Sequence, residues 1–250
     1  MTRQHKKPPA RTLYWVNGSI PSWRVCLALH EKGLDFVGER LRVMTTPKET
    51  RTPEFLAINP RGAAPALVEA DGTVVVESLA ILLYLERCYP ERPLLPDPND
   101  HRANARVLSR VHASEELRAA YRPLELLFRP PAELSAEART RAAAAPAAVD
   151  RELARWEADL AGDPFIAGAT LSLADSAFYP ALAYQLHRGL VLQDRFPGLA
   201  AYAARMAERP ASLRARPQGW IRRGKRDLFA IAAELRDAHR ALRRAPDPLS

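Results

Sequence analysis

Cysteine is scarce in this chain, with only Cys26 and Cys88 among its 250 residues. Two thiols are too few for a disulfide framework or a cysteine-rich zinc cluster, and no zinc-finger spacing occurs, so we expect no metal. Each cysteine falls in an apolar stretch with helical spacing. There we expect it to pack as a small hydrophobic side chain.

Long apolar runs are also missing. No run approaches the roughly 20 residues that cross a bilayer, so we expect no membrane association. Residues 1–11 are basic and contain proline, but no apolar segment follows them. We interpret them as a disordered basic tail rather than a signal peptide, and we expect a soluble cytoplasmic protein.

Acidic residues are outnumbered, at 29 against 37 lysines and arginines, which gives a formal net charge of +8. The excess is spread along the chain with small clusters only at its ends, and no RNA-binding aromatic signature accompanies it. We therefore expect no nucleic-acid partner. The charge favours solubility and the attraction of anionic ligands.

The first part of the chain alternates between strand-like and helix-like patterns. The expected elements are a strand at 12–16, a helix at 20–32, a strand at 36–43, a short helix at 50–58, a hairpin of 66–69 and 73–76, and a helix at 78–88. The Asp71-Gly72 pair between two β-rich runs is a strong hairpin signal. A first βαβ unit followed by a hairpin is the thioredoxin-like order, with one parallel and further antiparallel strand pairs.

Four prolines between residues 90 and 100 mark a stiff linker, and the patterns beyond it are helical. We expect helices at 101–127, 147–160, 172–187 and 197–208, with Pro146 limiting the start of the second. The predicted domains are therefore 12–90, a linker at 91–100, and an all-helical domain at 101–250.

The chain ends in an apolar stripe with a period of seven residues, made by Ile221, Leu228, Leu235 and Leu242. This stripe predicts an amphipathic helix at about 220–243. Acidic residues among its arginines weaken a membrane-surface interpretation. We expect this C-terminal helical extension to dock on its own helical domain near the mouth of the substrate pocket.

The most informative segment runs from Asn59 to Val68 and is followed by Glu77-Ser78. Its sequence, Asn-Pro-Arg-Gly-Ala-Ala-Pro-Ala-Leu-Val, resembles the glutathione transferase family. The resemblance implies a cis peptide bond before Pro65, a geometry accessible almost only before proline. It also implies that the backbone of Ala64 pairs with the cysteinyl part of glutathione, as an added strand would.

In this resemblance Ser78 begins the third helix of the first domain. Its hydroxyl and the free N–H groups of the helix start form an anion site for the γ-glutamyl carboxylate of glutathione, with Glu77 near the amino group. A simple N-cap is the plainer interpretation of Ser78, and the two can hold together. Glutathione is thus the expected co-substrate.

The catalytic residue is expected where the first strand turns into the first helix. The pattern Ser19-x-x-Ser22-Trp23-Arg24-Val25 resembles zeta-class enzymes, whose activating serine matches Ser19. A hydroxyl donor and a helix N-terminus together lower the pKa of a thiol. Ile20-Pro21 stands where that class has a serine and a cysteine, which weakens the case for maleylacetoacetate isomerase activity.

Other side chains compete for roles at this site. Tyr14 is the rival activator, although a packed strand aromatic explains it more simply, and Ser22 and Asn17 rank behind. We expect the electrophile's pocket between the domains, lined by Tyr14, Ile20, His112 and Glu116. Glu115, Arg118 and Tyr121 are further candidates on the same helix, where a solvated face is the plainer explanation for most of these residues.

The second domain also carries family resemblance, in residues 165–175. Ser172 and Asp175 have the spacing of a capping box, to which we assign a structural role. The whole resemblance implies a detoxifying transferase that forms homodimers and adds the glutathione thiolate to a small, apolar electrophile. Two alternatives stay open: a glutathione-dependent cis–trans isomerase, and a non-catalytic interaction module with the same fold.

Overall fold

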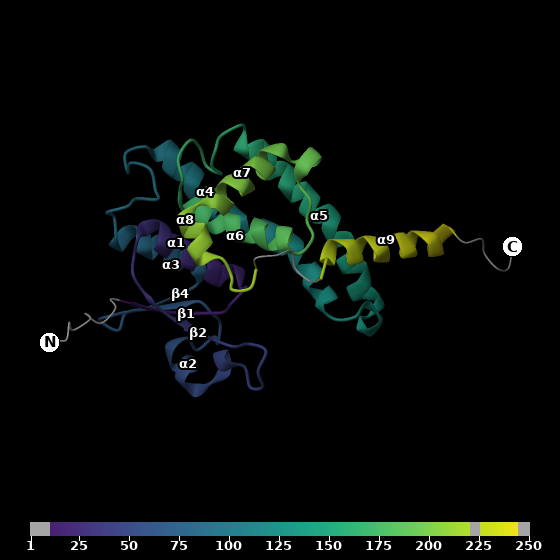
Figure 1. The fold of residues 1–250 in the computed structure, drawn as a ribbon, viewed down its shortest axis with the longest axis horizontal. Helices are drawn as coiled ribbons and strands as arrows, with labels where there is room; N and C mark the ends of the chain where they lie inside the picture. The colour runs from purple at the N-terminus through teal and green to yellow at the C-terminus, as the bar shows by residue number, and fades with distance from the viewer. Residues whose placement is uncertain (1–10, 221–225, 245–250) are drawn as a thin grey trace.

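The chain builds a small sheet domain and a larger helical domain that lie against each other (Figure 1). The structure is a computed structural model that describes residues 11–220 and 226–244. The sequence-based expectations for residues 1–10, for Ile221 and for the side chain of Leu242 lie outside the described residues. Arg11 is a buried strand residue, so the prediction of a disordered tail is wrong at that position.

The sheet domain has the predicted thioredoxin-like order. Its strands are β1 (Arg11–Trp15), β2 (Val37–Arg40), β3 (Ala66–Glu69) and β4 (Val74–Val76), in the spatial order β2-β1-β3-β4. β1 pairs with β2 in parallel and with β3 antiparallel, and β3 pairs antiparallel with β4. Leu13 and Leu67 lie opposite each other in this register and are fully buried. The parallel pair and the hairpin are confirmed.

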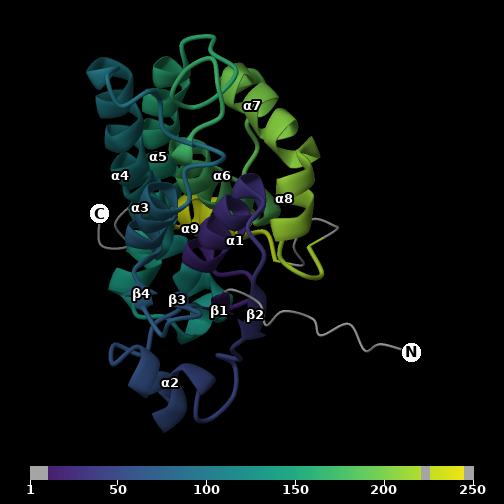
Figure 2. The ribbon, with the colours of Figure 1, turned by 90° about the vertical axis from the view of Figure 1, so that its left-hand side faces the viewer.

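Helices cover the two faces of this sheet unequally (Figures 1 and 2). α1 (Ile20–Lys32) and α3 (Ser78–Cys88) lie between the sheet and the helical domain, and α2 (Pro53–Ile58) lies on the opposite side. α1 has the predicted bounds because Gly33 ends it in the left-handed conformation, at φ 65°. The face that meets the helical domain therefore carries the long helices.

The named elements of the second domain are all helices in the described residues. Its main elements are α4 (His101–Tyr121), η2 (Arg122–Phe128), α5 (Ala136–Leu160), α6 (Leu173–His187), α7 (Pro197–Glu208), α8 (Pro210–Ala215) and α9 (Leu228–Arg244). α6 is the central helix, buried along most of its length. The buried carboxylate of Asp175 accepts hydrogen bonds from the N–H of Ser172 at 2.7 Å and of Ile166 at 2.9 Å, so this motif is structural, as expected.

Two helix boundaries differ from the prediction. α4 ends at Tyr121 and continues as the 3₁₀ turn η2, since Pro123 has no N–H to extend an α-helix. α5 begins at Ala136 and passes through Pro146, so the prediction that Pro146 limits its start is wrong. Ser135 caps this helix, and the surrounding alanines favour helix strongly enough to tolerate the proline.

Smaller departures are confined to exposed or irregular segments. β2 ends at Arg40, and the predicted helix at 50–58 divides into a 3₁₀ turn at Glu49–Arg51 followed by α2.

Cys26 is buried as predicted, and burial raises the pKa of its thiol to about 12. Cys88 is exposed at the end of α3, so the prediction of a packed side chain is wrong there. No disulfide joins them.

The C-terminal helix docks on its own domain, as expected, but not at the pocket mouth. α9 contacts α5 and η2, with Leu228 and Ala232 fully buried and Ile231 and Leu235 partly buried. It begins at Leu228, whose N–H donates to the carbonyl of Arg188 at 2.9 Å. Figure 1 shows α9 running outward past α5, away from the sheet domain.

No helix in the described residues is long and apolar enough to cross a bilayer. In the same part of the chain, no cluster of three or more His, Cys, Asp or Glu side chains has the arrangement of a metal site.

Candidate functional site

A buried asparagine fixes the loop that leads into β3. Asn59 is 3% exposed, and its Nδ2 donates to the carbonyl of Ala63 at 2.6 Å while its Oδ1 accepts from the N–H of Arg61 at 3.1 Å. The loop then enters β3 through the Ala64-Pro65 peptide bond, which is cis as the resemblance implied. Asn59 thus holds in place the backbone edge at Ala64.

The start of α3 has an unusual backbone conformation. Glu77 occupies the N-cap position with φ 68°, a region that non-glycine residues rarely adopt. Ser78 is the first helical residue, so the simpler interpretation of Ser78 as the N-cap is wrong. The first N–H groups of a helix have no partners within it, and the residues that start this helix line a cleft. Backbone strain of this kind is characteristic of binding sites.

A cleft of about 520 Å³ brings these elements together with α4. Residues 63–65 and 77–80 line one side, while His112, Glu115 and Arg118 line the other. Pro21, in the first turn of α1, also lines the cleft. Of the residues proposed from the sequence, Ala64, Pro65, Glu77, Ser78 and His112 therefore meet in one place.

Other proposed residues do not line this cleft. Glu116 is exposed, because it lies about 100° around the helix from its neighbour Glu115. Positions 112, 115 and 118 share the cleft face since residues three apart are neighbours on a helix. Tyr121 is buried and outside the lining, as is Ile20. The helical spacing was visible in the sequence, but it did not indicate which face meets the cleft.

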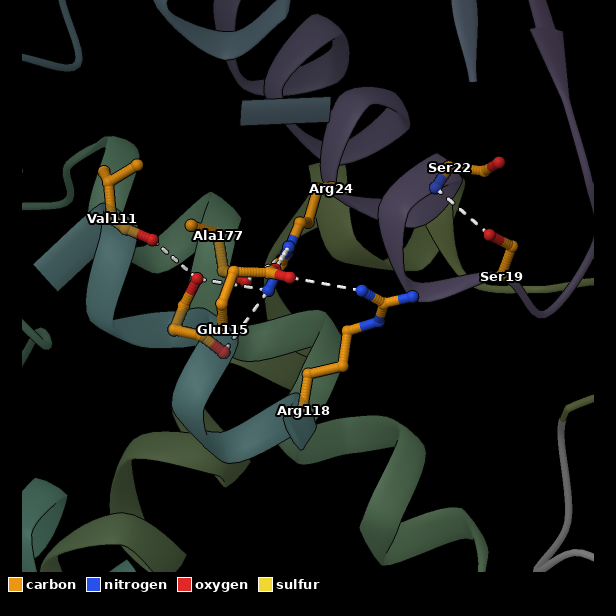
Figure 3. A network of polar contacts seen from close by, with 8 residues as sticks. Ser19, Ser22, Arg24, Val111, Glu115, Arg118 and Ala177 are labelled. Carbon is orange, nitrogen blue, oxygen red and sulfur yellow. Dashed lines mark hydrogen bonds and ion pairs between the residues drawn. The ribbon is translucent and has the colours of Figure 1, made fainter. Parts of the chain in front are cut away.

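A buried arginine joins the α4 wall to the first domain (Figure 3). Arg24 of α1 is 1% exposed and donates to the carbonyl of Ala177 at 2.7 Å and to the hydroxyl of Ser114 at 3.1 Å. It also forms an ion pair with Glu115, whose other carboxylate oxygen accepts from Arg118 at 3.1 Å. Arg24 thus fixes α4 and α6 against α1.

This network carries one more positive than negative charge, although Arg24 is buried and does not itself line the cleft. Burial lowers the pKa of Arg24 and the Glu115 carboxylate works against that effect; a guanidinium nevertheless keeps its proton in proteins. Burial disfavours the charged form of Glu115, but Arg24 and Arg118 outweigh it and hold the pKa of this carboxyl below its usual value. One carboxylate therefore balances two guanidinium groups. Figure 3 shows Arg118 extending from α4 toward the first turn of α1.

Ser19 is not itself among the residues that line the cleft, but it lies two positions before Pro21, which is. It is the N-cap of α1, half-buried, and its hydroxyl accepts from the N–H of Ser22 at 3.5 Å. Such a contact is long, and it leaves the hydroxyl hydrogen available to a ligand. Tyr14 packs on Phe55, with ring centroids 5.9 Å apart and the rings tilted by 52°, and does not line the cleft.

The other two rival donors already have partners. Ser22 is fully buried, and its hydroxyl accepts from the N–H of Val16 at 3.1 Å. The side chain of Asn17 exchanges two hydrogen bonds with the backbone of Gln218, at 2.9 and 3.2 Å. These contacts give both residues a role in shaping the loop before Ser19. No local pattern in the sequence pointed to Gln218, which lies 201 positions further along the chain.

The sheet order, the cis-proline loop and the helical second domain define a glutathione-transferase-like architecture. The model of the glutathione S-transferase N-terminal domain matches residues 19–88, and that of the C-terminal domain matches residues 104–210. The chain is 31% identical to glutathione S-transferase A of Pleuronectes platessa over 216 residues, covering 84% of this chain and 92% of that protein. The chain belongs to the glutathione S-transferase family.

Shorter stretches resemble particular classes more strongly. Identity reaches 48% over 93 residues with a zeta-class glutathione S-transferase of Euphorbia esula, covering 37% of this chain and 40% of that protein. It is 39% over 94 residues with maleylacetoacetate isomerase of Pseudomonas aeruginosa, covering 38% and 44%. These matches agree with the resemblance to zeta-class enzymes, but they span less than half of each relative.

Solved structures agree on the fold. A glutathione S-transferase from the Antarctic clam Laternula elliptica aligns with a TM-score of 0.77 at 28% identity, covering 90% of this chain and 99% of that one. A sphingomonad glutathione S-transferase complexed with glutathione aligns with a TM-score of 0.68 at 33% identity, covering 82% and 96%.

Proposed function

We propose that this chain binds glutathione in the cleft between its domains and transfers the thiolate to a small electrophile. The observation that carries the proposal is the convergence of Ala64, cis-Pro65, Glu77 and Ser78 on one side of a single cleft, beside the start of α1. The edge of Ala64 accommodates the cysteinyl backbone. Ser78 and the free N–H groups of α3 accommodate the γ-glutamyl carboxylate.

Activation falls to Ser19 in this proposal. Its hydroxyl donates to the glutathione sulfur and stabilises the thiolate, assisted by the positive N-terminus of α1. Lowering the pKa of a free thiol by about two units from its ordinary value of about 8.5 requires roughly 2.7 kcal/mol of preference for the charged form. The thiolate then forms a carbon–sulfur bond. In a substitution, the leaving group departs with the electrons of the bond that breaks. In an addition, the π electrons of the double bond move onto the conjugated carbonyl, and the resulting enolate is then protonated.

The electrophile's chemistry follows from the α4 wall. His112, Glu115 and Arg118 give this wall polar side chains, whereas the sequence analysis expected an apolar electrophile. We therefore propose an electrophile with a polar or anionic substituent next to its reactive carbon, because Arg118 supplies an accessible cation at the cleft.

Isomerisation is the second candidate function. It is favoured by the stretch that resembles a maleylacetoacetate isomerase. In that reaction the thiolate adds to an activated cis double bond, the adduct rotates, and the thiol is expelled. Ile20-Pro21 weighs against this alternative, since neither residue supplies a hydroxyl or thiol beside Ser19.

Turnover with a panel of electrophiles tests the proposal. Glutathione is supplied with an aryl halide, an α,β-unsaturated acid and an activated cis-alkene, and products are identified by mass. We expect conjugates from at least one of the first two, and a 10- to 100-fold lower kcat for Ser19→Ala with little change in the KM for glutathione, equivalent to about 1.4–2.7 kcal/mol. Tyr14→Phe is the matched control and stays within about twofold.

An unchanged kcat in Ser19→Ala would remove this serine from the mechanism. Conversion of the cis-alkene to the trans-alkene, without any stable glutathione conjugate, would favour the isomerase. Glutathione binding without any turnover would favour a non-catalytic interaction module.

Homodimer formation, a cytoplasmic location and a role in detoxification remain part of the proposal. The exposed Met44 and Val74 of the first domain, at 96% and 44%, are apolar side chains that a second copy could cover. Sedimentation at micromolar concentration gives the mass directly, and a monomer would refute the dimer.

A further inference from the structure

The loop before Ser19 is held at two points, one near in sequence and one remote. The near anchor lies within the loop and α1: the N–H of Ser19 donates to the carbonyl of Val16 at 3.2 Å, and the N–H of Val16 donates to the Ser22 hydroxyl at 3.1 Å. The remote anchor is a turn at residues 217–220, closed by the N–H of Trp220 on the carbonyl of Pro217 at 3.2 Å. We call it the 217–220 turn.

Hydrogen bonds connect this turn to the loop in a specific register. The Asn17 side chain accepts from the N–H of Gln218 at 2.9 Å and donates to its carbonyl at 3.2 Å. An amide that both donates to and accepts from one residue's backbone fixes orientation as well as distance. The side chain of Gln218 accepts from Arg40, at the end of β2, at 3.1 Å. These hydrogen bonds hold the 217–220 turn in a fixed position against the sheet domain.

Packing fixes the same loop from the other direction. A Cβ atom on Gly18 would lie 3.2 Å from the Trp220 ring, so glycine is needed there both for this approach and for its φ of 78°. The Trp220 ring stacks on His187 at 3.9 Å and 5°, and contacts Trp23 edge-on at 5.8 Å. Trp220 is therefore a rigid wall behind Gly18, the residue next to Ser19.

We infer that Asn17 and Trp220 are positioning residues for Ser19, so that the far end of the chain sets the acidity of the bound thiol. This inference rests on the proposed function and deepens it. The contact of Ser19 with its own helix, at 3.5 Å, is too long to fix the hydroxyl direction by itself. A hydroxyl that stabilises a thiolate must be held within a fraction of an ångström, and the two anchors of the loop supply that constraint.

The thiolate absorbance of bound glutathione, titrated against pH, tests this inference. Asn17→Ala removes both hydrogen bonds to Gln218, and Trp220→Ala removes the wall behind Gly18. We expect each to raise the apparent pKa of the bound thiol by about half a unit or more, which is roughly threefold less thiolate below that pKa. Affinity for glutathione should stay within about twofold, because the cleft residues of β3 and α3 are untouched.

Two further variants separate positioning from general loss of stability. Phe229→Ala also removes an aromatic contact of the C-terminal part, with Tyr121 at 6.1 Å, but does not touch the loop. It should lower the melting temperature and leave the thiol pKa unchanged. Trp220→Phe keeps an aromatic wall, so the pKa of the bound thiol should stay close to that of the parent. If Trp220→Ala does not fold, Asn17→Ala alone decides the outcome.

The failure of this inference is distinguishable from failure of the proposed function. Glutathione that does not bind, or a Ser19→Ala variant with the parent's thiol pKa, would overturn the proposed function and this inference with it. A Ser19→Ala shift without any shift in Asn17→Ala and Trp220→Ala would overturn the positioning role alone. An equal shift in Phe229→Ala would do the same.

Discussion

The two walls of the cleft are built by different means. The wall from the sheet domain is mostly backbone: the edge at Ala64, the cis bond before Pro65, and the N–H groups at the start of α3. The α4 wall is made of side chains, namely His112, Glu115 and Arg118. Backbone geometry requires particular residues at particular positions, whereas a helix face accepts many side chains. The first wall therefore suits a constant ligand, and the second suits one that differs between relatives.

The largest expected effect comes from removing Arg24, the buried side chain that links the first domain to the α4 wall. Arg24→Met removes the buried guanidinium and leaves the Ala177 carbonyl and the Ser114 hydroxyl without this donor. We expect the free energy of unfolding to fall by about 3 kcal/mol, measured by chemical denaturation. Arg118→Met is the matched control: it loses the same partner, Glu115, from an exposed position, and should cost less than about 1 kcal/mol. Equal costs would contradict the linking role of Arg24.

The backbone wall is probed with a smaller change at Ser78. Ser78→Ala removes one hydroxyl but keeps the N–H groups of α3, so glutathione affinity should fall by about 1 kcal/mol, roughly fivefold. The exposed Ser109→Ala on α4 should leave the affinity unchanged. Calorimetry measures both. Affinity equal to the parent's in Ser78→Ala would mean that the hydroxyl does not contact the ligand.

The smallest expected effect is a pH dependence of the side-chain wall. The pKa of Glu115 lies below its usual value in the folded chain because of Arg24 and Arg118, so its contribution to stability is present at neutral pH. That contribution is lost as pH falls below about 4.3 and through the depressed folded pKa. The difference in unfolding free energy between the parent and Glu115→Gln should therefore shrink from pH 7 toward pH 3. A difference that stays constant or grows would contradict this.

The same contrast explains what the sequence could predict. The backbone wall was foreseeable since its geometry depends on a local motif: proline at 65 and the Glu77-Ser78 pair. The ends of α1 were foreseeable because Ser19 caps one end and Gly33 terminates the other. The polar face of α4 was not, since positions 112, 115 and 116 all looked equivalent before the orientation of the helix was known.

Long-range contacts escaped the sequence entirely. The pairing of Asn17 with Gln218 joins residues 201 positions apart, and neither residue carries a local signal for it. The prediction that Pro146 limits the start of α5 failed for a different reason. The helix propensity of the alanine-rich run outweighs the local penalty of one proline. Cys88 misled because it ends α3 on the exposed side, which the apolar pattern of that helix does not reveal.

Calorimetric titration with glutathione and with cysteinylglycine tests the central claim most directly. The two thiols share the cysteinyl backbone that pairs with Ala64, and they differ in the γ-glutamyl carboxylate assigned to Ser78 and the start of α3. The account predicts that glutathione binds and that cysteinylglycine binds at least about tenfold more weakly, a loss of about 1.4 kcal/mol. Equal affinities, or no binding of glutathione, would contradict it.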